Sequence, residues 1–159
     1  MGRHYLLQPI KFADAKIILM TSHFESLKPN SAERKNQLKE ILEYMKRQTG
    51  NFNVVFGGDT NLRDSEVNAI GGLPNGVFDA WEKCGSSLTA QYSWDTSENN
   101  NTQSSYKAKL RFDRIFIKPA ENSQKLVPSD FTLVGKERLA SCGRFASDHW
   151  AVWLEIKVQ

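Results

Sequence analysis

The spacing of hydrophobic residues along the chain predicts one long amphipathic helix. Apolar side chains recur at i, i+3, i+4 and i+7, the repeat of a single helix face, at Leu38, Ile41, Leu42 and Met45. Asn30 and Glu33 are spaced as a capping box that would open this helix, and Gly50 is placed to end it. We expect this helix to serve as scaffold, with its apolar face packed on a sheet.

Short apolar or alternating segments around this helix predict strands. They are residues 5–7, 16–20, 54–56, 109–117 and 152–158. The segment 16–20 is continuously apolar, which suits a strand covered on both faces, and a turn at residues 13–14 joins it to the first strand. Charged and apolar residues alternate over 109–117 until Pro119, whereas the segment from there to Gly143 is expected to be looser.

Three further segments and the last strand complete the predicted order. Asp64 is placed to cap a short helix that runs to Ile70, residues 77–81 suit a packed turn, and the polar residues 98–105 suit a mobile surface loop. The last strand has one core-facing side, formed by Val152, Leu154, Ile156 and Val158. This order of strands and helices indicates the α/β class (α+β in some schemes), with the long helix covering one face of a sheet.

Length and composition are those of one globular domain. The 159 residues are 40% hydrophobic and 25% charged, and the net charge of +3 permits a polyanionic partner without demanding one. No apolar run reaches the ~20 residues that a bilayer span needs, so no membrane association is expected. The two cysteines allow at most one disulfide, which makes a reducing compartment, the cytosol or the nucleus, the expected location.

The polar residues that follow one apolar strand are the first candidates for a functional site. After residues 54–56 the chain continues with Gly57, Gly58, Asp59, Thr60 and Asn61. Glycines let the backbone approach another group closely, and polar groups at the end of a buried strand sit on a rigid mount at the rim of a pocket. The carboxylate could hold a water for attack and the amide a substrate oxygen. The alternative is that these residues form only a turn, because all five types favour turns.

Polar side chains also flank three other predicted strands, and they are His23 with Ser26, Asp113, and Asp148 with His149. Each has a structural explanation when taken alone. His23 could bond to the backbone, Asp113 could be an exposed charge on a sheet, and residues 147–149 could form an Asx turn. Four strand ends that each carry an acid, an amide or an imidazole favour a shared site. We therefore expect the Asp59 and His149 side chains to open onto the same side of the molecule.

These residue types suit the hydrolysis of a phosphodiester. That reaction needs a water positioned by a carboxylate, donors for the phosphate oxygens and usually a divalent cation. Asp59 can orient the water, and Asp148 or Asp113 can help to hold Mg²⁺, a hard cation that prefers oxygen ligands. Donors for the phosphate are offered by Asn61, His23, His149 and Arg63. No cysteine–histidine spacing in the sequence supports zinc.

Four of these segments resemble the motifs of one known superfamily. Residues 21–23, 57–63, 111–115 and 147–150 are similar to motifs of the endonuclease/exonuclease/phosphatase superfamily. Segments 71–74, 92–96, 109–116 and 142–145 are similar to the tyrosyl-DNA phosphodiesterases within it, and the likeness runs from about Met20 to Trp153. The superfamily's first two motifs, a strand-end asparagine and the principal metal-binding glutamate, match no residue here. The resemblance therefore implies a single, partial domain over residues 1–159, the C-terminal part of a DNase I-like α/β/β/α sandwich of four layers.

The resemblance also implies an activity and a role for each candidate residue. The implied reaction is Mg²⁺-dependent hydrolysis, with Mn²⁺ as a substitute, of the 5′-phosphotyrosyl bond between DNA and a trapped topoisomerase II peptide, in DNA repair. Asp59 would orient the water, Asn61 and His149 would hold the phosphate, Asp113 would fix the imidazole, His23 would assist, and Asp148 would lie in or beside the metal shell. The resemblance implies contacts to the DNA 5′ end from His23, Ser26, Asn61, Leu62 and Arg63. It also implies a wall, against which terminal nucleotides pack, formed by Trp94, Leu110 and Phe112. A monomer in the nucleus or cytoplasm is expected.

Two alternatives of different kinds stay open at this point. The chain could be another phosphodiesterase of the superfamily, such as an abasic-site endonuclease or a phosphoinositide or sphingomyelin hydrolase. It could also be a catalytically incomplete fragment that binds DNA or a partner, since two motifs are unmatched. For Trp94 and Phe112 the alternative is a place in the core, where buried aromatic residues commonly lie.

Overall fold

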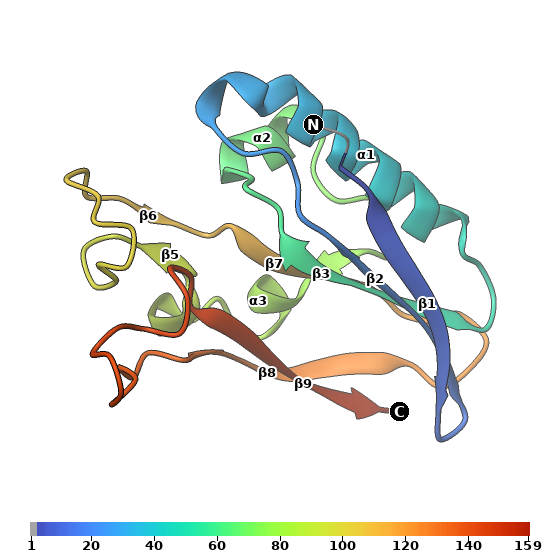
Figure 1. Cartoon of the computed structure of the whole chain (residues 1–159). Coiled ribbons are helices and arrows are strands. Elements are labelled where there is room, and N and C mark those ends of the chain that lie inside the picture. Colours follow the sequence, from blue (N-terminus) through green and yellow to red (C-terminus); the bar gives the residue numbers. More distant parts are fainter. Residues whose placement is uncertain (1–2) are drawn as a thin grey trace.

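A five-stranded sheet with the order β1-β2-β3-β7-β4 organises the computed structural model, which describes residues 3–159 (Figure 1). Its strands are β1 (Tyr5–Phe12), β2 (Ala15–Ser22), β3 (Phe52–Asp59), β4 (Phe78–Asp79) and β7 (Asp113–Lys118). Two pairs of strands stand apart from it, β5 (Trp94–Asp95) with β6 (Lys109–Leu110), and β8 (Leu126–Val134) with β9 (Ala151–Val158). The helices are α1 (Ser31–Arg47), α2 (Asp64–Ala69) and α3 (Ala80–Lys83), with single 3₁₀ turns at Lys28–Asn30 and Leu88–Ala90.

The central sheet is covered on its two faces by different elements, as Figure 1 shows. On one face, α1 packs its predicted apolar stripe onto the sheet, so that Leu38, Ile41, Leu42 and Met45 are buried against Ile18, Met20, Val54, Phe56 and Phe116. On the other face, Ile117 and Val55 pack against Phe131 of β8 and Leu154 of β9. The mixed α/β class is confirmed, and the layers run helix, sheet, sheet.

Strand β1 leaves part of this sheet uncovered. All eight of its residues are exposed, with Leu6 at 72% and Phe12 at 64% of their surface accessible. Leu19 on β2 is 40% exposed, so the prediction that the second strand is covered on both faces is only partly correct. An apolar groove of about 610 Å³ runs between Leu6, Leu19 and Val55. No helix within residues 3–159 is both long enough and apolar enough to cross a membrane.

The alternating segment 109–117 forms two strands instead of one, and the prediction of a single strand is wrong. Residues 111–112 separate β6 from β7. Two charged side chains of the segment are buried: Arg111, just before β7, is 7% exposed, and Arg114, on β7, is 3% exposed. Asp64 accepts from the Arg114 Nη2 atom at 2.7 Å and from Arg111 Nη2 at 3.0 Å, and Asp79 also pairs with Arg111. Asp64 therefore neutralises these buried cations instead of capping α2.

Four other local predictions need correction. At the start of α1, the Asn30 side chain donates to the Ser26 carbonyl at 2.9 Å and makes no capping box with Glu33. At the start of α2, the Glu66 side chain accepts from the Arg63 backbone N–H. Helix α1 ends at Arg47, before Gly50. The segment expected to be loose contains the nine-residue strand β8. The loop over residues 98–105 is partly anchored, because Asn99 is buried and donates to Ser147 O at 2.9 Å.

Candidate active site

Three strands of the central sheet bring their polar ends to one edge. Strands β2 and β3 are parallel, so their carboxyl ends meet, and β7 runs antiparallel to β3 with Asp113 paired to Asp59. The loop after β2 stays close to β3, because the Phe24 backbone N–H donates to the Asp59 carbonyl at 2.9 Å. This approach requires a glycine at residue 58, where a Cβ atom would lie 2.2 Å from the Ser22 carbonyl oxygen.

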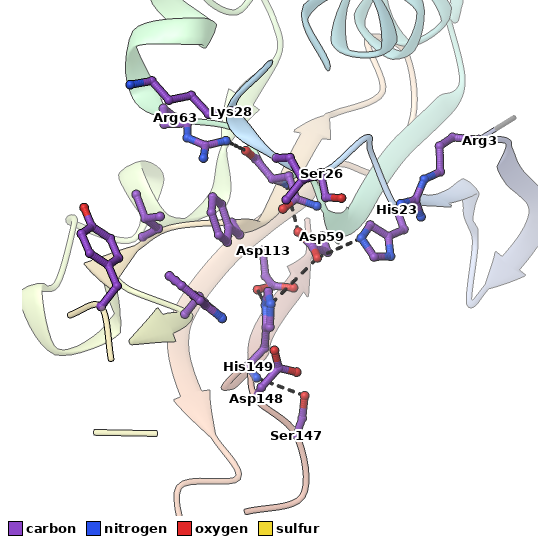
Figure 2. A pocket seen from close by; sticks show the side chains of 16 residues that line it. Arg3, His23, Ser26, Lys28, Asp59, Arg63, Asp113, Ser147, Asp148 and His149 are labelled. Atoms are coloured by element: carbon purple, nitrogen blue, oxygen red, sulfur yellow. Dashed lines mark hydrogen bonds and ion pairs between the residues drawn. The ribbon is translucent and has the colours of Figure 1, made fainter. Parts of the chain in front are cut away.

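An acid–imidazole cluster forms where these ends meet the segment before β9 (Figure 2). His149 Nδ1 lies 2.6 Å from Asp113 Oδ2, a hydrogen bond that orients the imidazole. The opposite ring nitrogen, Nε2, faces Asp59 Oδ2 at 4.0 Å, and His23 Nε2 approaches the same oxygen to 3.3 Å. The Asp59 and His149 side chains thus open onto the same side of the molecule, although 90 residues of sequence separate them.

The protonation of this cluster is shifted by its surroundings. Burial and the neighbouring Asp113 charge raise the pKa of Asp59 above its ordinary value, against the lowering effect of the hydrogen bond from the Asn61 backbone. Burial alone would lower the pKa of His149, but the hydrogen bond and charge of Asp113 raise it above its ordinary value. The site therefore combines a carboxylate of increased basicity with an imidazole that readily carries a proton.

Asn61 occupies a backbone conformation that few other residues adopt. Its φ is +49°, in the left-handed region that asparagine tolerates better than most residues. Its N–H donates to Asp59 Oδ1 at 2.9 Å, and its carbonyl accepts from Arg63 Nη1 at 2.8 Å. The turn predicted at this position is therefore present, and it also fixes the Asp59 carboxylate and brings Arg63 to the same opening.

A pocket of about 740 Å³ surrounds the cluster and contains almost all of the predicted site residues. Those that line it are His23, Ser26, Asp59, Asn61, Arg63, Trp94, Leu110, Phe112, Asp113, Asp148 and His149. Leu62 does not line it, because its side chain is fully buried in the core; its predicted contact to the DNA 5′ end stays a prediction. Sequence reasoning missed Arg3, Leu27, Lys28, Tyr106 and Ser147. A position next to Ser26 could have suggested Leu27 and Lys28, whereas no sequence signal marked Arg3 or Tyr106.

One side of the pocket is aromatic. Trp94 and Phe112 lie with ring centroids 5.7 Å apart, and Phe112 stacks at 6.2 Å on the His149 imidazole. The Arg63 guanidinium lies 5.3 Å above the Phe112 ring, and Leu110 pairs with Trp94 across β5 and β6. Phe112 is mostly buried yet forms part of the pocket surface, and the half-buried Trp94 does the same. These rings thus offer a face beside the acid–imidazole cluster.

The cluster also includes a set of atoms that could hold a metal ion. Asp59, Asp113 and His149 each offer one ligand atom, and these atoms lie within 4.8 Å of one another. Asp148, the predicted metal residue, lies outside this set but lines the same pocket. Its carboxylate is exposed and has no hydrogen-bond or ion-pair partner within residues 3–159.

Comparisons with known proteins agree on the relatives of this chain, although no protein-family model matches it. Tyrosyl-DNA phosphodiesterase 2 of Gallus gallus is 44% identical over 158 residues, which is 99% of this chain and 42% of that protein. A crystal structure of Danio rerio TDP2 complexed with single strand DNA product is 42% identical with a TM-score of 0.94, and the match covers 98% of this chain and 62% of that one.

A more distant structure shows the fold alone. An endonuclease/exonuclease/phosphatase family protein from Bacteroides thetaiotaomicron is 18% identical with a TM-score of 0.60, over 92% of this chain and 51% of that one. The DNase I-like fold is therefore confirmed, whereas the extent of the domain stays a prediction. The chain is a homologue of tyrosyl-DNA phosphodiesterase 2 over nearly its whole length, and it spans about two fifths of the length of the curated relatives that it matches.

Proposed function

We propose that this chain carries the catalytic side of a phosphodiesterase that hydrolyses the bond between a DNA 5′ phosphate and a tyrosine. The observation that carries the proposal is the convergence of Asp59, Asp113 and His149 beside an aromatic wall. The peptide linked to the DNA would come from a trapped topoisomerase II. We further propose that the protein acts as a monomer in DNA repair, in the nucleus, the cytoplasm or both.

We propose a separate task for each group around the scissile phosphate. Asp59, whose pKa is raised, would orient the attacking water and accept its proton. His149, held by Asp113 at 2.6 Å, would donate to a phosphate oxygen together with Asn61. The leaving phenol has a pKa of about 10, far below that of a sugar hydroxyl, so its departure needs little help from an acid. No further general acid is therefore required in the pocket.

We propose Mg²⁺ as the metal, with Mn²⁺ as a substitute. Mg²⁺ is usually held by one or two carboxylates, several waters and the substrate phosphate, and the unpaired Asp148 carboxylate at the pocket fits that role. Asp113 fits it less well because its carboxylate already binds the His149 imidazole. When bound, the ion would neutralise charge on the phosphate oxygens.

We expect a chelator to abolish turnover and added Mg²⁺ to restore it, measured on a 5′-phosphotyrosyl oligonucleotide.

A comparison of two substrates tests the proposal against the nearest alternative. The chain, supplied with Mg²⁺, is assayed on a 5′-phosphotyrosyl oligonucleotide and on a duplex of the same sequence that contains an abasic site. We expect release of free tyrosine and a 5′-phosphate end from the first and little cleavage of the second. Faster cleavage at the abasic site would replace the proposal with an endonuclease. Binding of DNA ends without turnover of either substrate would favour a non-catalytic fragment.

Removal of the aromatic wall should weaken the binding of DNA ends. Stacking of a base on an aromatic side chain contributes about 1–3 kcal/mol, so Trp94→Ala should raise the Kd for a short 5′-phosphorylated oligonucleotide by roughly 5- to 150-fold. Trp153→Ala is the matched control, because Trp153 is 58% exposed on β9 and does not line the pocket. Equal Kd values for the two variants, measured by fluorescence anisotropy, would show that Trp94 does not stack on the DNA.

A further inference from the structure

Ser93 connects the segments that carry Asp113 and His149, although it does not line the pocket itself. It directly precedes β5 and is only 1% exposed. It is absent from the pocket surface, whereas its neighbour Trp94 forms part of the aromatic wall. A buried hydroxyl normally has hydrogen-bond partners, and the partners of this one define its role.

The Ser93 hydroxyl holds the backbone that carries Asp113. Ser93 Oγ accepts from the Phe112 N–H at 3.2 Å and from the Asp113 N–H at 3.0 Å. From the opposite side, the Phe112 carbonyl accepts from both the N–H of Thr60, at 2.9 Å, and its hydroxyl, at 2.7 Å. The peptide before Asp113 is thus clamped between Ser93 and Thr60 at the point where residues 111–112 interrupt the strands.

The Ser93 backbone holds the other member of the pair. Its carbonyl accepts from the N–H of Trp150, the residue after His149, at 2.7 Å. On the other side of His149, the Ser147 carbonyl accepts from Asn99 at 2.9 Å. A single buried residue is therefore bonded to the segments of both Asp113 and His149, whose side chains meet at only 2.6 Å. Such a short contact depends on the relative placement of the two segments.

We propose that Ser93 is a positioning residue that sets the distance between Asp113 and His149. The catalytic meaning of this placement depends on the proposed function, but the placement itself does not. Loss of the hydroxyl would leave two buried N–H groups without an acceptor and free the Asp113 backbone to move. The Trp150 bond would remain, because it uses the Ser93 carbonyl. His149 would then stay in place while its carboxylate partner shifts away.

The test compares Ser93→Ala with Ser93→Thr, which keeps a hydroxyl at the same atom, and with Thr96→Val. Thr96 is a matched control because its buried hydroxyl, 4% exposed, donates to Tyr106 O at 2.6 Å and contacts neither Asp113 nor His149. In Ser93→Ala we expect hydrogen exchange of the Phe112 and Asp113 amides to speed up by about 5- to 150-fold relative to residues 115–117. We expect Ser93→Thr to restore slow exchange and Thr96→Val not to change it.

Two further measurements separate positioning from a loss of stability and from a failure of the proposed function. The ring ¹⁵N chemical shifts of His149, one of three histidines in the sequence, report whether Nδ1 carries a proton and donates it in the hydrogen bond to Asp113. The ¹⁵N shifts of a protonated Nδ1 should be lost in Ser93→Ala and kept in Ser93→Thr and Thr96→Val, whether or not the chain hydrolyses phosphotyrosyl DNA. If the chain hydrolyses phosphotyrosyl DNA, kcat should fall about 10- to 100-fold with little change in KM. An unchanged His149 signature in Ser93→Ala, or one lost equally in Thr96→Val, would overturn the proposal.

Discussion

Asp59→Asn is expected to lower kcat for a 5′-phosphotyrosyl oligonucleotide by about 10²- to 10⁴-fold, the usual contribution of a general base. Asparagine has the size of aspartate and can still accept the Asn61 N–H bond of 2.9 Å, so the turn that carries it should persist. What is lost is the negative charge that orients the water and accepts its proton. Single-turnover kinetics with Mg²⁺ in excess would measure the chemical step directly.

The expected change at Asp59 is specific to its place in the pocket. Asp130→Asn is the matched control, because Asp130 is exposed on β8 and does not line the pocket. We expect its kcat to equal that of the parent chain. Asp59→Asn should also keep its affinity for the 5′-phosphorylated product, since removal of a negative charge does not weaken phosphate binding. Activity within a factor of about three of the parent would show that another group orients the water.

Those parts of the site that depend on single segments were predictable from the sequence. Asp59 and Asn61 directly follow an apolar strand, and His23 likewise follows the apolar segment 16–20. The α1 stripe from Leu38 to Met45 was equally predictable, because helical periodicity depends only on local spacing. Local patterns and family motifs together therefore point to residues that line one pocket.

The parts that depend on long-range pairing were not predictable from local patterns. The alternation of 109–117 indicates a strand period, but it shows neither the break at residues 111–112 nor which charged side chains are buried. Arg111 and Arg114 are buried because Asp64 and Asp79, more than 30 residues earlier, neutralise them. A motif likewise does not show which of its side chains face the pocket and which face the core. Leu62 therefore could not be told apart from Asn61 and Arg63, although it lies in the core between these two pocket residues.

Arg34→Met is expected to lower the free energy of unfolding by about 3–5 kcal/mol, the typical cost of removing one member of a buried ion pair. Arg34, on α1, is 1% exposed and donates to both carboxylate oxygens of Glu66, at 2.7 and 3.2 Å. It also donates to the Glu25 and Leu27 carbonyls, at 3.1 and 2.6 Å, so it fixes the loop that carries Ser26. The substitution would leave the buried Glu66 carboxylate without its arginine partner, and urea unfolding would measure the lost stability.

The matched control for this change lies on the same helix. Lys46 pairs with Glu43 at 3.9 Å, and both side chains are more than 60% exposed, so Lys46→Met should cost no more than about 0.5 kcal/mol. Adding Glu66→Gln to Arg34→Met should restore part of the loss, because the unpaired charge is removed. Equal losses in the Arg34 and Lys46 variants would show that the buried pair does not stabilise the junction of α1 and α2.

The same ion pair predicts how stability depends on pH. Burial alone would raise the pKa of Glu66, but the hydrogen bonds from Arg34 lower it from 4.5 to about 2. A carboxyl whose folded pKa is depressed contributes stability that is complete above its unfolded pKa and is lost as the pH falls toward the folded value. The free energy of unfolding should therefore decrease between about pH 4.5 and 2, and Glu66→Gln should flatten that decrease. An equally steep decrease in the variant would assign the acid sensitivity to other carboxyl groups, such as Asp64 beside its two arginines.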